Sequence, residues 1–222
     1  PKNRLHLYVR TNNNTDTSAN ILAAWLERVG PQYASVYYDD SDLEVNLERF
    51  ADHEWTGERF KALGAIRQES MNWAMAQNCD FYWVQDVDNF VLPNCLAEMV
   101  AADVNIVAPL VRIGENFNRG YANYHGALDP NGYFADDPMY FTFFHRKYRG
   151  LSEQPVVHCT YLVKTSAIPR LTYDDDSGRY EYVIFSHSAR KAGIPQLLDT
   201  HHYWGWLTFL GASDYFHPDT YD

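Results

Sequence analysis

Hydrophobic positions near the start of the chain follow first a period of two and then a helical period. Residues 5–9 alternate between apolar and polar side chains and lead into a polar, Asn-rich loop at 11–16. Apolar residues then recur at helical spacing over 21–29, and a second apolar run occupies 35–38. A strand, a helix and a strand of these lengths predict a parallel pair of strands joined by a crossover helix.

The same alternation of strands and helices continues through the chain. An amphipathic pattern predicts a helix over 57–77, and the later segments predict strands at 81–85, 105–110 and 156–163 and helices at 93–102 and 180–193. The run 197–206 is predicted to be a strand end followed by a His-aromatic cluster. With no repeat and no linker, a chain of 222 residues is expected to form one α/β domain over 1–222.

One segment departs from this pattern. Residues 112–151 are dominated by Gly, Asn, Tyr, Asp and Phe, with a strong turn signal at 129–132. Long irregular stretches inside compact domains are usually functional. We therefore interpret this segment as an insertion that binds an acceptor or closes as a lid.

Composition excludes several classes of protein. The formal net charge is −11 without a cluster of Lys and Arg, which argues against a nucleic-acid partner. No segment is as apolar and long as a membrane span and no signal peptide is visible, so we expect a soluble protein. The three cysteines lack the spacing of a zinc site or a disulfide framework. Because the chain begins at Pro1, we expect it to be part of something longer.

The strongest chemical signal is the pair Asp86 and Asp88. The pair follows the apolar run 81–85, and alternation along an extended chain places both carboxylates on one side of the strand end. Ligands bind at the carboxyl ends of strands in open α/β sheets, and two hard oxygen donors suit Mg²⁺ or Mn²⁺. Such an ion usually takes further ligands from phosphates, which indicates a nucleotide or nucleotide-sugar substrate.

Other charged residues have a structural interpretation beside the functional one. Arg59 and Arg67 lie on the predicted helix 57–77, where each is placed either to contact a diphosphate or to pair with a neighbouring Glu. His158, inside the predicted strand 156–163, is more simply a core histidine.

Several segments together resemble the glycosyltransferase domain of the collagen β-galactosyltransferases, which is related to that of the multifunctional lysyl hydroxylases. The similarity extends in order over nearly the whole chain, through residues 11–26, 25–30, 33–34, 55–59, 67–70, 82–90, 107–109 and 155–162. This resemblance implies a GT-A fold, in which a Rossmann-like sheet with helices on both faces binds the nucleotide. It also implies an enzyme of the endoplasmic reticulum lumen, with no indication of its oligomeric state.

The activity implied by the resemblance is inverting, Mn²⁺-dependent transfer of galactose from UDP-galactose to hydroxylysine on collagen-like proteins. Mg²⁺ is the alternative ion. Asp86 and Asp88 match the metal ligands, and His201 or His202 falls where a third ligand is expected. The residues expected to contact the nucleotide are Asn14, Asp16, Arg59, Arg67 and Asp86.

Two departures from the family pattern bear on activity. The family has a pair of adjacent carboxylates where this chain has Tyr180 and Glu181. Glu181 is therefore the candidate general base. The plainer interpretation of Glu181 is an exposed carboxylate at the start of a helix. The family's first strand, which lines the uridine site, is expected to be absent. Two alternatives follow, a non-catalytic binding domain of the same fold and an active transferase that uses another UDP-sugar, such as glucose, or another acceptor.

Overall fold

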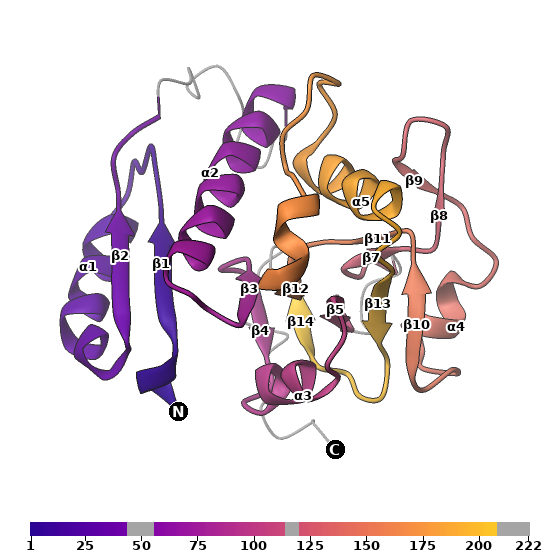
Figure 1. The fold of residues 1–222 in the computed structure, drawn as a ribbon, viewed down its shortest axis with the longest axis horizontal. Helices are drawn as coiled ribbons and strands as arrows, with labels where there is room; N and C mark the ends of the chain where they lie inside the picture. Colours follow the sequence, from indigo (N-terminus) through magenta and orange to yellow (C-terminus); the bar gives the residue numbers. More distant parts are fainter. Residues whose placement is uncertain (44–55, 114–119, 208–222) are drawn as a thin grey trace. The chain divides into compact units, whose positions relative to one another are not determined.

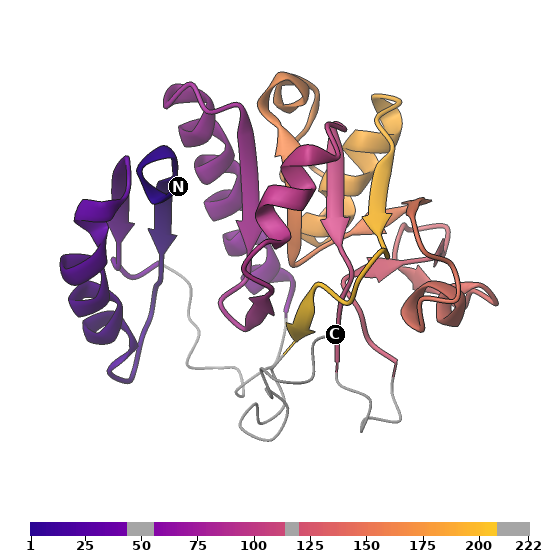
Figure 2. The same ribbon diagram turned by 90° about the horizontal axis from the view of Figure 1, so that it is seen from below.

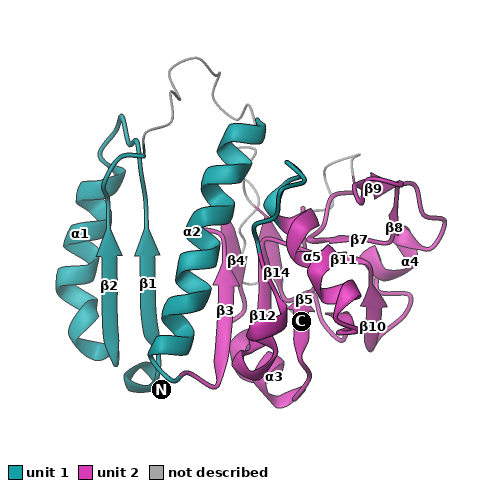
Figure 3. Ribbon diagram, turned by 45° about the horizontal axis from the view of Figure 1, so that its top comes forward, with its two compact units in different colours: residues 1–78, 173–181 teal, residues 79–172, 182–222 magenta. Residues whose placement is uncertain are grey.

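The computed structural model describes residues 1–43, 56–113 and 120–207. Within it the chain forms two compact units, coloured separately in Figure 3. Unit 1 comprises residues 1–78 and 173–181, and unit 2 comprises residues 79–172 and 182–222. The predicted α/β class is confirmed. That the units act as one domain over 1–222 stays a prediction, and Trp55 of the segment 55–59 lies outside the described residues.

Unit 1 contains the strand, helix and strand predicted at the start of the chain. Strands β1 (His6–Arg10) and β2 (Ser35–Asp39) pair in parallel, and helix α1 (Ser18–Val29) connects them (Figure 1). Short 3-10 helices precede β1 at Lys2–Arg4 and β2 at Gly30–Gln32. Because the two strands run in the same direction, the loops that follow them leave from the same edge.

The second helix of unit 1 is α2 (Gly57–Ala76), which matches the predicted helix over 57–77. It begins where the Thr56 side chain accepts a hydrogen bond from the backbone N–H of Arg59. The segment 173–181 returns to this helix, since the Tyr173 backbone N–H donates to the Gln68 side-chain oxygen over 3.0 Å. Residues distant in sequence therefore build one face of α2.

Unit 2 is organised around a five-stranded mixed sheet. Its strands in spatial order are β10 (Leu151–Gln154), β13 (Gln196–Asp199), β5 (Ile106–Pro109), β12 (Thr160–Lys164) and β3 (Phe81–Gln85). β5 and β13 are parallel and point the same way in Figure 2, while β12 is antiparallel to both β5 and β3. It follows that β3, β5 and β13 all end at the same edge of the sheet.

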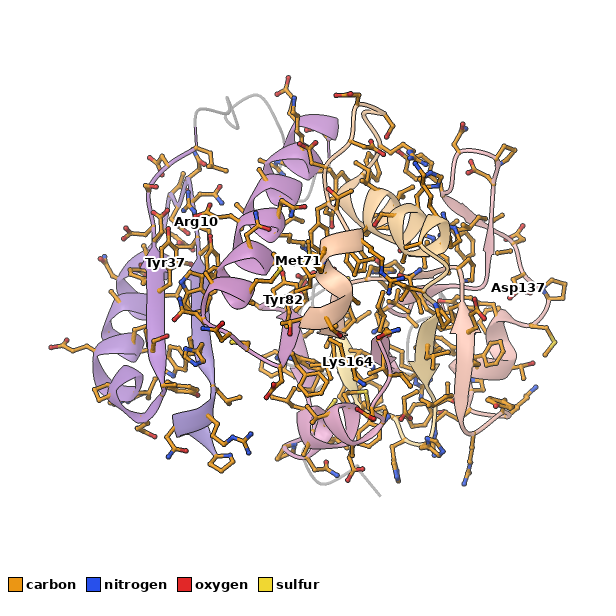
Figure 4. The ribbon with its side chains drawn as sticks, viewed as in Figure 1. Arg10, Tyr37, Met71, Tyr82, Asp137 and Lys164 are labelled. Carbon is orange, nitrogen blue, oxygen red and sulfur yellow. The ribbon has the colours of Figure 1, made fainter. Side chains whose placement is uncertain are left out.

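Each of these three strands continues into a smaller sheet beyond that edge. β4 (Asn89–Val91) follows β3, β6 (Val111–Arg112) follows β5, and β14 (Gly205–Leu207) follows β13. In the smaller sheet, β14 pairs with both β4 and β6. Helix α3 (Cys95–Ala101) precedes β5, and α5 (Glu181–Lys191) precedes β13. The core beneath α3 joins the buried residues Cys95, Met99, Val107, Leu162 and Trp204. Tyr82 of β3, labelled in Figure 4, is also buried.

The segment predicted as one strand over 156–163 forms two. β11 (Val156–Val157) pairs with β7 (Tyr124–His125), whereas β12 joins the five-stranded sheet. Cys159, between them, has a φ of 64°, in the left-handed region that interrupts an extended strand. A 3-10 helix at Thr165–Arg170 follows β12.

The described part of the insertion 112–151 contains short regular elements. β8 (Ala127–Leu128) and β9 (Phe134–Ala135) form an antiparallel hairpin around the predicted turn, where Gly132 has a φ of 92°. Helix α4 (Tyr140–Phe144) follows the hairpin. Among the described residues no helix is long and apolar enough to cross a membrane.

Candidate functional site

Asp86 and Asp88 lie in the tight turn between β3 and β4, at the carboxyl edge of the large sheet. The Asp86 backbone N–H donates to the Cys159 carbonyl oxygen over 3.0 Å, and the Asn89 backbone N–H donates to the Asp86 carbonyl oxygen over 3.0 Å. Both carboxylates are half-buried. The turn is therefore held at both ends by backbone hydrogen bonds, and its two acidic side chains occupy the place predicted from the sequence.

The electrostatics of this pair fit a cation. Burial raises the pKa of the Asp88 carboxyl above its ordinary value, and the neighbouring negative charge of Asp86 raises it further. A divalent cation between the two carboxylates would offset both effects, and carboxylate oxygens are the donors that Mg²⁺ and Mn²⁺ prefer. The two aspartates are thus suited to hold such an ion.

His201 and His202 make contacts near the end of β13. They follow β13, which lies three strand positions from β3, a separation of roughly 14 Å at ordinary strand spacing. The His201 Nδ1 atom lies 3.1 Å from the Asp199 Oδ1 atom, and the His202 ring contacts Trp204 edge to face. Across residues 1–43, 56–113 and 120–207, no group of three or more His, Cys, Asp or Glu side chains is placed to hold a metal.

Asn14 and Asp16 lie in unit 1, in the loop that follows β1. The Asn14 side-chain oxygen accepts a hydrogen bond from the Thr11 hydroxyl over 2.9 Å. The Asp16 carboxylate accepts one from the Ser18 backbone N–H over 2.9 Å, and this bond lowers the pKa of Asp16. Since Ser18 is the first residue of α1, Asp16 serves the start of that helix.

Arg67 and Glu181, predicted for two different roles, form an ion pair within unit 1. The Arg67 Nη1 atom lies 3.4 Å from the Glu181 Oε1 atom, and the side chains are only 6% and 3% exposed. Gly64 leaves room for this contact, because a Cβ there would lie 3.1 Å from the Glu181 Cβ atom. Arg59 lies in the first turn of α2, where it is half-buried. His158 is buried, as predicted.

Two features at the strand ends were not predicted from the sequence. Arg10, labelled in Figure 4, closes β1 and its Nε atom lies 3.3 Å from Asp39 Oδ2 at the end of β2. Asn89 follows Asp88 directly and its side chain donates to the Thr160 hydroxyl over 2.7 Å. The position of Asn89 beside the acidic pair was a usable signal, whereas the Arg10–Asp39 contact depends on strand register alone.

A mixed α/β fold with an acidic pair at the carboxyl edge of a strand is typical of nucleotide-dependent transferases. The model of one such family, described as glycosyltransferase family 25, N-terminal domain, matches residues 1–217, and the chain belongs to this family. It therefore corresponds to the N-terminal domain of that family.

Curated relatives fall into two kinds. The chain is 28% identical over 217 residues to human procollagen galactosyltransferase 2, covering 93% of this chain and 34% of the relative. It is 26% identical over 219 residues to the mouse inactive glycosyltransferase 25 family member 3, covering 95% of this chain and 36% of the relative. The chain thus spans about a third of the length of these relatives.

A solved glycosyltransferase involved in glycosylation of the PBCV-1 major capsid has a TM-score of 0.30 and 11% identity, covering 74% of this chain and 61% of its own. This similarity is too low to support an inference about fold or function.

Proposed function

We propose that this domain transfers galactose from UDP-galactose to hydroxylysine on collagen-like proteins, with inversion and with a bound Mn²⁺ or Mg²⁺. The observation that carries the proposal is the half-buried pair Asp86 and Asp88 at the carboxyl edge of β3, in a chain that belongs to glycosyltransferase family 25. The similarity to procollagen galactosyltransferase 2 supports galactose and collagen as the substrates. The GT-A fold belongs to the same proposal.

Galactosyl transfer requires the acceptor oxygen to attack the anomeric carbon while UDP departs. Asp86 and Asp88 would hold the divalent cation, which when bound neutralises the negative charge developing on the departing diphosphate.

Asn14, Asp16 and Arg59 are proposed to contact the nucleotide. Glu181 is proposed as the base that takes the proton of the acceptor hydroxyl. This role requires the hydroxyl to reach a carboxylate that is paired with Arg67. His201 or His202 is proposed as a further metal ligand.

One observation favours a second candidate function, a non-catalytic domain that binds a partner. Glu181, the single carboxylate left of the family's pair, is 3% exposed and paired with a buried Arg67, and such a carboxylate is well suited to a structural role. Similarity to the mouse inactive family member is compatible with this alternative. The two candidates differ in one measurable respect, turnover of a UDP-sugar.

The test is a transfer assay with this chain, Mn²⁺, UDP-galactose and a collagen-like peptide containing hydroxylysine. We expect UDP release together with addition of one hexose to the peptide. UDP-glucose in a parallel reaction distinguishes the donor sugar, and a matched lysine peptide shows that the hydroxyl is the acceptor. Release of UDP without addition of hexose to the peptide would contradict the proposal that hydroxylysine is the acceptor. Absence of both UDP release and hexose addition would favour the non-catalytic binding domain.

The residues are tested by the double variant Asp86→Asn and Asp88→Asn, which removes two charges without changing side-chain size. Loss of cation stabilisation is expected to slow transfer by at least about 100-fold. Asp174→Asn with Asp176→Asn is the matched control, because these exposed aspartates have the same spacing and the same change of charge. Equal rates for the two double variants would contradict the role of the acidic pair.

A further inference from the structure

A chain of buried hydrogen bonds lies directly beneath the acidic turn. The Asn89 side-chain amide donates to the Thr160 hydroxyl over 2.7 Å, and both residues are almost fully buried. The Asn123 side-chain amide donates to the Thr160 carbonyl oxygen over 3.2 Å and to the Pro109 carbonyl oxygen over 2.8 Å. This set of Asn89, Thr160 and Asn123, which we call the amide network, joins the ends of β3, β12 and β5.

The amide network is tied to the turn itself by the backbone of Asn89. The Asn89 N–H donates to the Asp86 carbonyl oxygen, and the Asn89 carbonyl oxygen accepts a hydrogen bond from the Gln85 side chain over 2.9 Å. Asn89 also pairs with Leu207 in the sheet between β4 and β14. Asn89 is thus bonded to the residues at both ends of the stretch 85–88, which carries the two carboxylates.

Stability alone does not explain an asparagine at this position. The Asn89 Oδ1 atom is buried without a hydrogen-bond partner within the described residues, although the side chain is only 2% exposed. A buried acceptor without a partner destabilises a fold, whereas an apolar side chain of the same size would avoid that penalty. An amide is therefore better explained by the placement of the adjacent carboxylates.

We propose that Asn89 is a positioning residue, which fixes the separation of the Asp86 and Asp88 carboxylates through its hydrogen bond to Thr160 and so sets the affinity of the domain for a divalent cation. This inference rests on the proposed function. Residues that orient metal ligands typically contribute about 10- to 100-fold to metal affinity when they are removed. The Asn89–Thr160 hydrogen bond acts as a unit, so removing either partner has the same effect.

A double-mutant cycle on cation binding tests this inference without any assay of turnover. The affinity for Mn²⁺ in the presence of saturating UDP is measured from the electron paramagnetic resonance signal of free Mn²⁺. Asn89→Leu and Thr160→Val are each expected to weaken binding about tenfold, and the double variant is expected to bind no more weakly than either single variant. Thr160→Ser keeps the hydroxyl and is expected to retain the wild-type affinity.

The matched control is Thr165→Val, in the first residue after the opposite end of β12. The Thr165 hydroxyl donates to the Cys79 carbonyl oxygen over 2.6 Å, so this variant also removes one hydroxyl next to β12 but leaves the acidic turn untouched. Its affinity for Mn²⁺ is expected to equal that of the wild type. Thermal unfolding of each variant separates loss of affinity from loss of folded protein.

The possible failures are distinguishable. If the wild-type chain binds Mn²⁺ with UDP but Thr160→Val binds as tightly as Thr160→Ser, the positioning role is overturned and the proposed function stands. Multiplicative losses in the double variant would likewise overturn it. If the wild-type chain binds no Mn²⁺ in the presence of UDP, both this inference and the cation-dependent mechanism fail. Should Asn89→Leu not fold, the comparison of Thr160→Val with Thr160→Ser decides the question alone.

Discussion

At the scale of single residues, Arg67 and Glu181 show how much a functional interpretation depends on burial. Arg67 was interpreted either as a diphosphate contact or as the partner of a Glu, and Glu181 either as a base or as a helix-start carboxylate. In the structure the two charges meet across 3.4 Å, with side chains 6% and 3% exposed. Moving a charge out of water costs several kcal/mol unless a partner of opposite charge accompanies it. The pair therefore stabilises the contact between α2 and the segment 173–181, whatever its part in catalysis.

Arg67→Met is expected to lower the free energy of unfolding by about 3 to 5 kcal/mol, because it leaves Glu181 buried without this partner. The measurement is urea denaturation followed by fluorescence. Lys164→Met is the control, since Lys164, labelled in Figure 4, pairs over 2.7 Å with an Asp103 side chain that is 81% exposed. Exposed pairs contribute at most about 1 kcal/mol. Equal losses in the two variants would contradict a structural role for the buried pair.

The candidate site was partly predictable at this scale. Asp86 and Asp88 were placed correctly because alternation and the turn that follows are local properties of a short stretch. The pairing of Arg67 with Glu181 was not, since it depends on how two distant segments pack.

At the scale of secondary structure elements, the helices were predicted well and one strand was not. Periodicity defines α2 and α5 locally, and Thr56 caps the start of α2, which is why the predicted ranges 57–77 and 180–193 contain these helices. The run 156–163 is uniformly apolar or β-branched over most of its length and so predicts one strand. Its interruption at Cys159 gives no sequence signal, because left-handed backbone is usually marked by Gly or Asn.

The left-handed conformation of Cys159 leads to a prediction about stability. Cys159→Gly is expected to be more stable than Cys159→Ala by about 1 kcal/mol, since only glycine adopts this conformation without a steric penalty. At Cys79, whose φ lies outside this region, the order should reverse and alanine should be favoured by about 0.4 to 1 kcal/mol. Thermal unfolding of the four variants measures both differences. The same order at both positions would contradict the conformational explanation.

At the scale of the whole molecule, the order of strands determines which residues can share a site. The sheet order β10, β13, β5, β12, β3 separates the end of β13 from the end of β3. The family resemblance placed His201 or His202 with Asp86 and Asp88 as a third metal ligand, and this role stays a prediction. The fold class is accessible from local patterns, whereas sheet order and the division into two units require long-range contacts.

We propose that this family 25 domain binds a nucleotide sugar through a cation held by Asp86 and Asp88. The most direct measurement is calorimetric titration of UDP, with and without Mn²⁺, into the wild-type chain and into the double variant Asp86→Asn and Asp88→Asn. We expect UDP binding that requires Mn²⁺ and is lost in the double variant. UDP binding of equal strength in both proteins, or its absence from the wild-type chain in the presence of Mn²⁺, would contradict the claim.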